Sequence, residues 1–366
     1  MSIDTGDESA IEFLRGLVAI SSVSTQERAA VEYMVETMAA LGFDAEIDVA
    51  GNAVGRLGEG VRSLLLLGHI DTVPGEIPVR RERFGERDVL YGRGTVDAKG
   101  PLAAFVLAAA RAAQENVLRD DFQIVVVGAV EEEAATSKGA YHVVETYPPA
   151  DYVVIGEPSG WSRVTLGYKG RLLLDYRLER GVSHTAGQQR GVAEEAVEFW
   201  LRVRGYAAAY NADREGTFAT LDPSLRWIRS ESDGLVEWAE MSIGLRLPLG
   251  LDVDALVREA TTAWRGDAQV STRGYELPFR AEKRTPLTGA FLSAIRAEGE
   301  QATFVTKTGT SDMNVIGPRW NAPIVAYGPG DSNLDHTPNE HIDLGEYLKA
   351  IRVLTRVLGR LAAQGS

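Results

Sequence analysis

Hydrophobic residues follow two different spacings along the first half of the chain. Segments 11–18 and 31–38 carry apolar residues at helical intervals, which predicts two amphipathic helices. Continuous apolar runs without helical spacing are typical of short strands buried on both faces of a parallel sheet, and they occur at 64–67, 123–130 and 152–155. Further helices are expected after Pro101 and over 140–146. Strands that alternate with helices predict an α/β fold with a mostly parallel sheet.

The pattern changes between residues 164 and 277. Residues 165–180 (TLGYKGRLLLDYRLER) alternate like an antiparallel ribbon, and strand-like runs follow over 219–247, with a turn at Asp233-Gly234. Helices are expected over 192–203 and 253–264. From Pro286 the α/β pattern returns. We therefore predict a discontinuous catalytic domain, residues 1–163 and 278–366, with an inserted α+β domain, residues 164–277.

The second N-terminal helix carries possible signals at both of its ends. Ser24 is followed by Glu27 three residues later, a spacing that favours a capping box at the start of the helix. Gly42 marks its expected end.

Polar side chains follow the predicted buried strands, at the points where each strand ends. His69 and Asp71 follow the first apolar run, and a glutamate triple at 131–133 and Glu157 follow the next two. Asp97 precedes a helix, and His336 lies in a loop near the C-terminus. Because ligands of open α/β sheets bind at the carboxyl ends of the strands, these groups are expected to converge. Imidazole and carboxylate ligands suit Zn²⁺ or a similar first-row ion.

Composition narrows the range of function classes. The 366 residues contain no cysteine, which excludes disulfides, thiolate nucleophiles and cysteine-ligated zinc. A net charge of −14 argues against nucleic acid or an anionic membrane as a partner. No apolar run approaches the ~18 residues of a membrane span, and the N-terminal segment is acidic where a signal peptide would be basic, so a cytoplasmic protein is expected.

Seven segments, in order, resemble the M20 family of dinuclear zinc peptidases and aminoacylases. They are GHIDTVPG, YGRGTVDAKGP, GAVEEEAATSKGA, VIGEPSGW, TLGYKGRL, KTGTSDMNV and AYGPGDSNLDHTPNEH. The fuller strings resemble the branch of that family that hydrolyses amides of an amino-group carrier protein in lysine and arginine biosynthesis. The resemblance implies a zinc-peptidase-like catalytic domain with an inserted domain that serves as a lid and often dimerises.

The resemblance also implies a ligand set for two divalent metal ions, Zn²⁺ or Co²⁺. Asp97 would bridge the ions, His69 and Glu157 would complete one site, and Glu133 with His336 the other. His341 competes with His336 as the histidine ligand. Asp71 would receive the ring N–H of His69 and so fix its tautomer.

Glu132 would be the general base, which takes a proton from water and delivers it to the leaving amine. The family more commonly has Asp-Glu-Glu where this chain has three glutamates. A shift by one residue would make Glu131 the base and Glu132 the ligand, and we prefer Glu132 and Glu133.

Substrate contacts are carried over from the same resemblance. Arg246 matches an arginine that holds a substrate carboxylate, which a guanidinium can bind through two hydrogen bonds. His184 matches a lid histidine that supports the oxyanion in the partner subunit's site. Thr308, Gly309 and Thr310 match a backbone-rich loop near the substrate.

The predicted function is a metal-dependent amide hydrolase that releases lysine or ornithine from the γ-carboxyl of the C-terminal glutamate of an acidic, LysW-like carrier protein. An acidic enzyme would then need a local basic patch. The candidates are Arg80, Arg81 and Arg83, or else Arg163, Lys169 and Arg171. Two alternatives stay open: a deacylase or dipeptidase that acts on a free small N-acyl amino acid, and a non-catalytic metal-stabilised binding protein. The chain lacks a G-x-S-x-G motif and a complete phosphate-binding loop, which disfavours a serine hydrolase and a nucleotide-binding enzyme.

Overall fold

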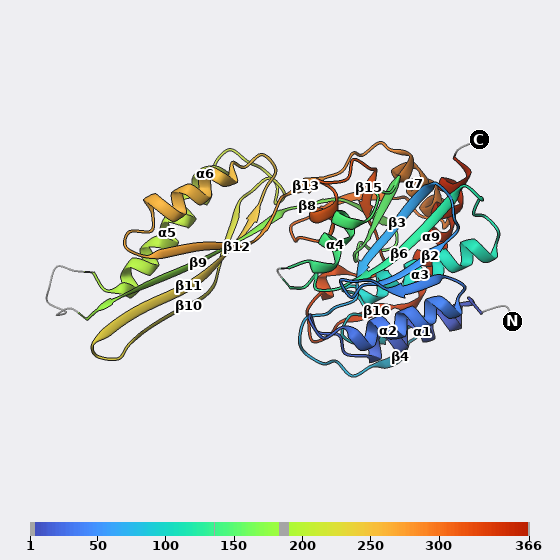
Figure 1. Cartoon of the computed structure of the whole chain (residues 1–366), viewed down its shortest axis with the longest axis horizontal. Coiled ribbons are helices and arrows are strands. Elements are labelled where there is room, and N and C mark those ends of the chain that lie inside the picture. Colours follow the sequence, from blue (N-terminus) through green and yellow to red (C-terminus); the bar gives the residue numbers. More distant parts are fainter. Residues whose placement is uncertain (1–3, 135, 183–189, 365–366) are drawn as a thin grey trace. The chain divides into compact units, whose positions relative to one another are not determined.

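The computed structural model describes residues 4–134, 136–182 and 190–364 (Figure 1). Contacts divide the chain into two compact units. The first unit comprises Met1–Gly167, Arg280–Thr306 and Ser311–Ser366, and the second comprises Tyr168–Phe279 and Lys307–Thr310. The predicted division placed the Lys307–Thr310 segment in the catalytic domain, whereas its contacts assign it to the second unit.

The first unit contains a mixed sheet that is parallel at its centre. The strand order is β1-β2-β6-β3-β7-β15-β8-β13, and β14 also pairs with β8. Neighbouring strands β6, β3, β7 and β15 are parallel, and β1 and β2 are antiparallel additions. The mostly parallel core of the predicted α/β fold is therefore confirmed. The bounds are β1 (Asp44–Ile47), β2 (Ala53–Leu57), β3 (Arg62–His69), β6 (Phe122–Ala129), β7 (Tyr152–Gly156), β8 (Arg163–Tyr168), β13 (Phe279–Arg280), β14 (Thr303–Lys307) and β15 (Ile324–Ala326).

Helices cover the apolar strands and form the core with them. Helix α3 is buried over nearly its whole length and packs on β3, β6, α1 and α9. The four leucines 64–67 of β3 are almost completely buried, which explains their continuous apolar run. The helices are α1 (Asp7–Ala19), α2 (Arg28–Ala40), α3 (Lys99–Gln114), α4 (Lys138–Thr146), α7 (Pro286–Ala297), α8 (Met313–Ile316) and α9 (Leu344–Ala363).

A small antiparallel sheet joins two distant parts of the first unit. Its strands are β4 (Arg80–Phe84), β5 (Arg87–Tyr91) and β16 (His341–Asp343), in the order β16-β5-β4. His341 lies opposite Tyr91. This register places the segment that precedes β16 beside the segment that follows β5, and both segments lead into the candidate site.

The second unit is a four-stranded antiparallel sheet with helices packed on it, as described for residues 168–182 and 190–279. The strand order is β10-β11-β9-β12, and α5 contacts β9, β10 and β11. Inward-facing residues of β9 and β11 form its core with α5 and α6. The elements are β9 (Gly170–Gly181), α5 (Val192–Asn211), β10 (Asp222–Ser232), β11 (Val236–Leu247), α6 (Val253–Arg258), a π-helical turn (Glu259–Ala263) and β12 (Gln269–Glu276).

Two local predictions were wrong. Residues 165–180 do not form one antiparallel ribbon, because β8 belongs to the first sheet and β9 to the second. Alternation identified both strands, but it carries no information about which partner each strand pairs with. The capping box at Ser24 and Glu27 is also not formed: α2 begins after Glu27, with no side-chain cap. Both side chains are engaged at the candidate site instead.

No helix among the described residues is long and apolar enough to cross a membrane.

Replacing Leu66 with alanine tests the role of the buried strand. Leu66 is fully buried at the centre of β3, so the substitution leaves a cavity and should lower the free energy of unfolding by about 3 kcal/mol. Val61, directly before the same strand, is 93% exposed, and Val61→Ala should change that free energy by less than about 0.5 kcal/mol. Urea unfolding of both variants measures the difference, and equal values would contradict the described burial.

Candidate metal centre

Three neighbouring parallel strands bring the polar residues to one edge of the first sheet. β3 ends at His69, which lies beside Ala129, the last residue of β6. The glutamate triple follows two residues later. β7 ends at Gly156, opposite Gly68 of β3, and Glu157 follows directly. The common direction of the strands therefore places His69, the triple and Glu157 at the same sheet edge.

Two groups of possible ligands form at this edge. The ligand atoms of Asp97, Glu133 and His336 lie within 4.8 Å of one another, and so do those of His69, Glu132 and Glu133. His336 Nε2 lies 3.0 Å from Asp97 Oδ2 and 2.9 Å from Glu133 Oε1. His69 Nε2 lies 3.2 Å from the other oxygen of Asp97, so the Asp97 carboxylate stands between the two histidines.

The carboxylates of this site are buried, so the site favours positive charge close to them. Burial raises the pKa of Glu132 well above its usual value, and the charges of Glu157 and Asp312 raise it further, while His69 opposes this. Hydrogen bonds that His336 donates to the Asp97 and Glu133 carboxylates raise its pKa to about 10. Burial alone would lower the pKa of His69, but hydrogen bonds to Asp71 and Asp97 raise it well above its usual value. Carboxylates thus raise the pKa of both rings, and the same carboxylates would attract a divalent cation.

The donor set fits divalent metal ions. Carboxylate oxygens and imidazole nitrogens converge within ligand distance of a shared centre, and these donors suit Zn²⁺ and related ions. Glu157 is 8% exposed and its charge acts on Glu132, but neither of the two groups found among the described residues includes it.

Comparison with known proteins shows the family. The sequence profile of Peptidase family M20/M25/M40 matches residues 65–360. The chain belongs to this family. It is therefore a metal-dependent hydrolase of amide bonds.

Relatives and solved structures agree with this membership. The [LysW]-lysine hydrolase of Deinococcus radiodurans is 45% identical over 97% of this chain and 97% of its own length. The [LysW]-lysine/[LysW]-ornithine hydrolase of Saccharolobus solfataricus is 28% identical over 93% of this chain and 92% of its own length. A tripeptidase of Staphylococcus aureus has the same fold, with a TM-score of 0.80 at 17% identity and full coverage of both chains. The M20 metallo-carboxypeptidase Sso-CP2 of Sulfolobus solfataricus superposes with a TM-score of 0.76 at 20% identity, covering 97% of this chain and 98% of its own.

Within this M20 site, the glutamate triple is divided between two environments. Glu131 adopts a left-handed backbone conformation, with φ of 62°, and its carboxylate accepts a hydrogen bond from Thr136 and lies 3.6 Å from Lys138. Glu132 and Glu133 belong to the ligand groups. This geometry favours Glu132 and Glu133, not Glu131 and Glu132, as the base and the ligand.

The two candidate C-terminal histidines also differ. His336 joins Asp97 and Glu133, whereas the His341 ring packs at a tilt against Tyr91, with ring centroids 4.9 Å apart. Nδ1 of His341 lies 2.7 Å from the carbonyl oxygen of Asn339. The geometry therefore favours His336 as the ligand.

Asp71 does more than orient His69. Nδ1 of His69 lies 3.0 Å from the Asp71 carbonyl oxygen and 3.5 Å from its carboxylate. The two carboxylate oxygens accept the backbone N–H groups of Glu132 and Glu133, at 3.0 Å each, and Ser24 Oγ donates to the second oxygen at 2.7 Å. Asp71 therefore anchors the backbone of both glutamates as well as the imidazole.

Other supporting residues were missed by sequence reasoning. Glu27 Oε1 accepts the N–H groups of Thr25 and Glu131, and Asn52 Oδ1 accepts that of Val130. The pair Ser24 and Glu27 was visible in the sequence, but its spacing also matches a helix cap. Asn52 carries no motif that could have revealed its role.

Arg246 and the predicted substrate residues Thr308, Gly309 and Thr310 lie in the second unit. Arg246 Nη1 donates to Thr310 Oγ1 at 3.3 Å, so the structure brings these two residues together. Thr308 and Gly309 lie in the same short segment as Thr310. His184 lies outside the described residues. Their roles stay predictions.

The basic candidates are largely neutralised or buried. Arg81 and Arg83 both pair with Asp88, and Arg80 pairs with Glu82. Lys169 is fully buried and donates to the Thr220 carbonyl oxygen at 2.5 Å, so the prediction that it meets a partner's acidic segment was wrong. Lys169 is the single residue between β8 and β9, and the strand residues on either side of it are buried, which explains the difference.

Replacing Asp71 with asparagine tests the anchoring role. Each carboxylate oxygen accepts a backbone N–H. In asparagine the NH₂ group would face one of these N–H donors, so that hydrogen bond would be lost and the free energy of unfolding would fall by about 2 kcal/mol. Asp233 accepts two backbone N–H groups on one oxygen in an exposed turn, which asparagine retains. Asp233→Asn should therefore cost less than about 0.5 kcal/mol. Urea unfolding of metal-stripped protein compares them, and a neutral Asp71→Asn substitution would refute the anchor.

Proposed function

We propose that this M20 enzyme releases L-lysine, L-ornithine or both from an amino-group carrier protein of the LysW type, in lysine and arginine biosynthesis. The amide bond joins the amino acid to the γ-carboxyl of the carrier's C-terminal glutamate. The proposal rests on the 45% identity to the [LysW]-lysine hydrolase of Deinococcus radiodurans, which extends over 97% of both chains. Similarity over the full length includes both units, and the substrate-binding candidates lie in the second.

Two divalent ions, Zn²⁺ or Co²⁺, are the cofactors in this proposal. Asp97, Glu133 and His336 would hold one ion, supported by their convergence. Asp97 would also bridge to the other ion, whose further ligands would be His69 and Glu157. When bound, such ions polarise the scissile carbonyl and lower the pKa of a water molecule.

Glu132 is the proposed general base. It takes a proton from the attacking water as the water oxygen bonds to the amide carbon, and it passes that proton to the nitrogen as the C–N bond breaks. The products are the free amino acid and the carrier's γ-carboxylate. Burial supports this role because it raises the pKa of Glu132, which makes the carboxylate a stronger base.

The other proposed roles concern substrate binding. Arg246 would bind the carboxylate of the released amino acid, since a guanidinium offers paired donors to carboxylate oxygens. Thr308, Gly309 and Thr310 would line the same subsite, which the contact between Thr310 and Arg246 supports. His184 would support the oxyanion.

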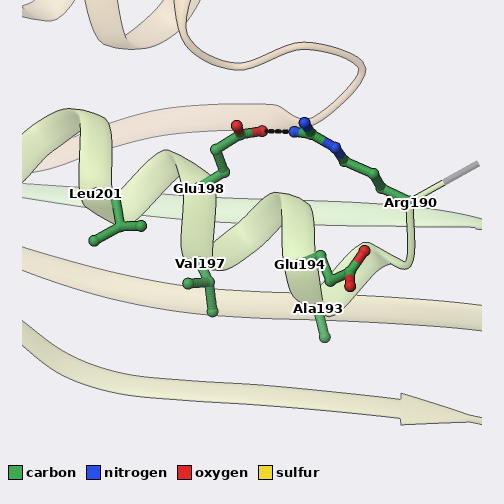
Figure 2. A pocket seen from close by; sticks show the side chains of 6 residues that line it. All are labelled: Arg190, Ala193, Glu194, Val197, Glu198 and Leu201. Atoms are coloured by element: carbon green, nitrogen blue, oxygen red, sulfur yellow. Dashed lines mark hydrogen bonds and ion pairs between the residues drawn. The ribbon is translucent and has the colours of Figure 1, made fainter.

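A homodimer in the cytoplasm completes the proposal. Figure 2 shows Ala193, Val197 and Leu201 along one side of α5, at a cavity of about 480 Å³, with an ion pair between Arg190 and Glu198 nearby. Val197 and Leu201 are 47% and 53% exposed. An apolar stripe at intervals of four residues supports the packing of a second copy there.

Replacing Glu132 with glutamine tests the assignment of the base. Glutamine keeps the size of the side chain but cannot accept the proton, so kcat should fall by about 10²- to 10⁴-fold with little change in metal content. Glu131→Gln is the matched control and should retain near-normal turnover, because Glu131 contacts Thr136 instead. Steady-state kinetics and metal analysis of both variants give the answer, and the reverse pattern would move the base to Glu131.

Substrate choice is tested by measuring amino-acid release from two amides. The metal-loaded enzyme is given lysine linked to the intact carrier protein and, separately, free γ-glutamyl-lysine and N-acetyl-lysine. We expect fast release from the carrier and a kcat/KM at least about a hundredfold lower for the small amides, a loss of about 2.7 kcal/mol of binding energy from the carrier. Equal or faster hydrolysis of the small amides would replace the proposal with a general deacylase or dipeptidase.

A further inference from the structure

A buried glutamate outside the predicted ligand set connects the two loops of the metal centre. Glu340 is fully buried and directly precedes β16. Because His341 pairs with Tyr91 across β16 and β5, Glu340 lies beside Gly92, whose N–H donates to the Glu340 carbonyl oxygen at 3.3 Å. The loop from Gly92 to Asp97 and the loop from His336 to Glu340 thus meet at this residue.

Both carboxylate oxygens of Glu340 are used on the Asp97 loop. Oε1 accepts the backbone N–H of Val96 at 2.9 Å and that of Asp97 at 3.2 Å. Oε2 accepts a hydrogen bond from Arg93 Nη1 at 2.7 Å. Glu340 therefore holds the backbone of Asp97 directly, and its charge is balanced by an arginine from the same loop.

Arg93 extends the connection back to the His336 loop. Its Nη1 also donates to the carbonyl oxygen of Thr337 at 3.4 Å, and its Nε donates to that of Gly75 at 3.0 Å. Thr337 directly follows His336, which has a left-handed backbone with φ of 61°. The pair Arg93 and Glu340 thus fixes the backbone next to each of two proposed ligands, whose side chains lie 3.0 Å apart.

We propose that Glu340 is a positioning residue that sets the separation of Asp97 and His336 and thereby the affinity of the metal site that they share with Glu133. This inference rests on the proposed metal centre. Asp97 and His336 are 239 residues apart in the sequence, so their relative position depends on a contact between their loops. Residues that orient metal ligands in this way typically contribute 10- to 100-fold to metal affinity.

Glu340→Gln breaks this connection with little change in shape. If the glutamine oxygen stays on the N–H groups of Val96 and Asp97, its NH₂ group meets the N–H donors of Arg93. If the amide turns over, its NH₂ group meets the two backbone N–H groups instead. Either orientation opposes donor to donor at a fully buried position.

The matched control is Glu298→Gln, a substitution of the same kind in the same unit. Glu298 is also a largely buried, ion-paired carboxylate, with Arg352 at 2.9 Å and Arg356 at 3.0 Å. It joins α7 to α9 and belongs to neither ligand group. A loss of stability that is general to buried ion pairs would appear in both variants.

The experiment is a Co²⁺ titration of metal-stripped protein, followed by visible absorption and by competition with a chelator. Wild type should bind two ions. In Glu340→Gln, one binding step should weaken at least tenfold with an altered cobalt spectrum, and Glu298→Gln should match wild type in both steps. Glu340→Asp keeps the charge but shortens the side chain, and it should show the same weakened step. This variant serves as the test if Glu340→Gln does not fold.

The outcomes separate this inference from the proposal on which it rests. The positioning role would be overturned, with the metal centre left intact, if Glu340→Gln showed two binding steps and a cobalt spectrum like those of wild type. The same result in Glu340→Asp decides the question if only that variant folds. Equal weakening in Glu298→Gln would overturn it as well, because the effect would then be general. Wild-type protein that binds no Co²⁺ would overturn the metal centre itself and this inference with it.

Discussion

The accumulation of negative charge at one buried sheet edge is the constraint on which the rest of the structure depends. Glu132, Glu133 and Glu157 lie directly beyond the ends of parallel strands, with Asp97 beside His69, and burial raises the pKa of Glu132 and Glu133. The neighbouring carboxylates raise the pKa of both His69 and His336. Divalent cations balance the negative charge, because each carries two charges and binds several carboxylates at once. The composition of the site and its metal dependence therefore have one physical cause.

The same edge shows how such a site is kept in shape. Two of the loops that carry proposed ligands are held through their backbone N–H groups by a buried carboxylate: Asp71 holds Glu132 and Glu133, and Glu340 holds Asp97. Carboxylates suit this task because they accept several hydrogen bonds and strengthen those bonds through their charge. They also place still more negative charge around the site. Arg93 balances Glu340, which leaves the charge of the ligands themselves for the metal ions.

The fold and the convergence of most candidate ligands at one sheet edge were predictable because they depend on local signals. The continuous leucines of β3 identify a buried parallel strand, and His69 at its end follows from the direction of that strand. The supporting contacts were not predictable, because they depend on tertiary position. Ser24 and Glu27 have the spacing of a helix cap, yet they bind Asp71 and the N–H of Glu131. Glu340 is 244 residues from Val96 in sequence, and only the pairing of β5 with β16 brings them together.

Anomalous X-ray diffraction from crystals grown with Zn²⁺, recorded on both sides of the zinc absorption edge, tests the central claim most directly. The account predicts two peaks at the carboxyl edge of the first sheet, one of them about 2.0–2.2 Å from atoms of Asp97, Glu133 and His336. The other peak should share Asp97 and contact His69. Zinc bound only elsewhere on the protein, or a zinc-free edge in crystals that contain zinc at other sites, would contradict the account.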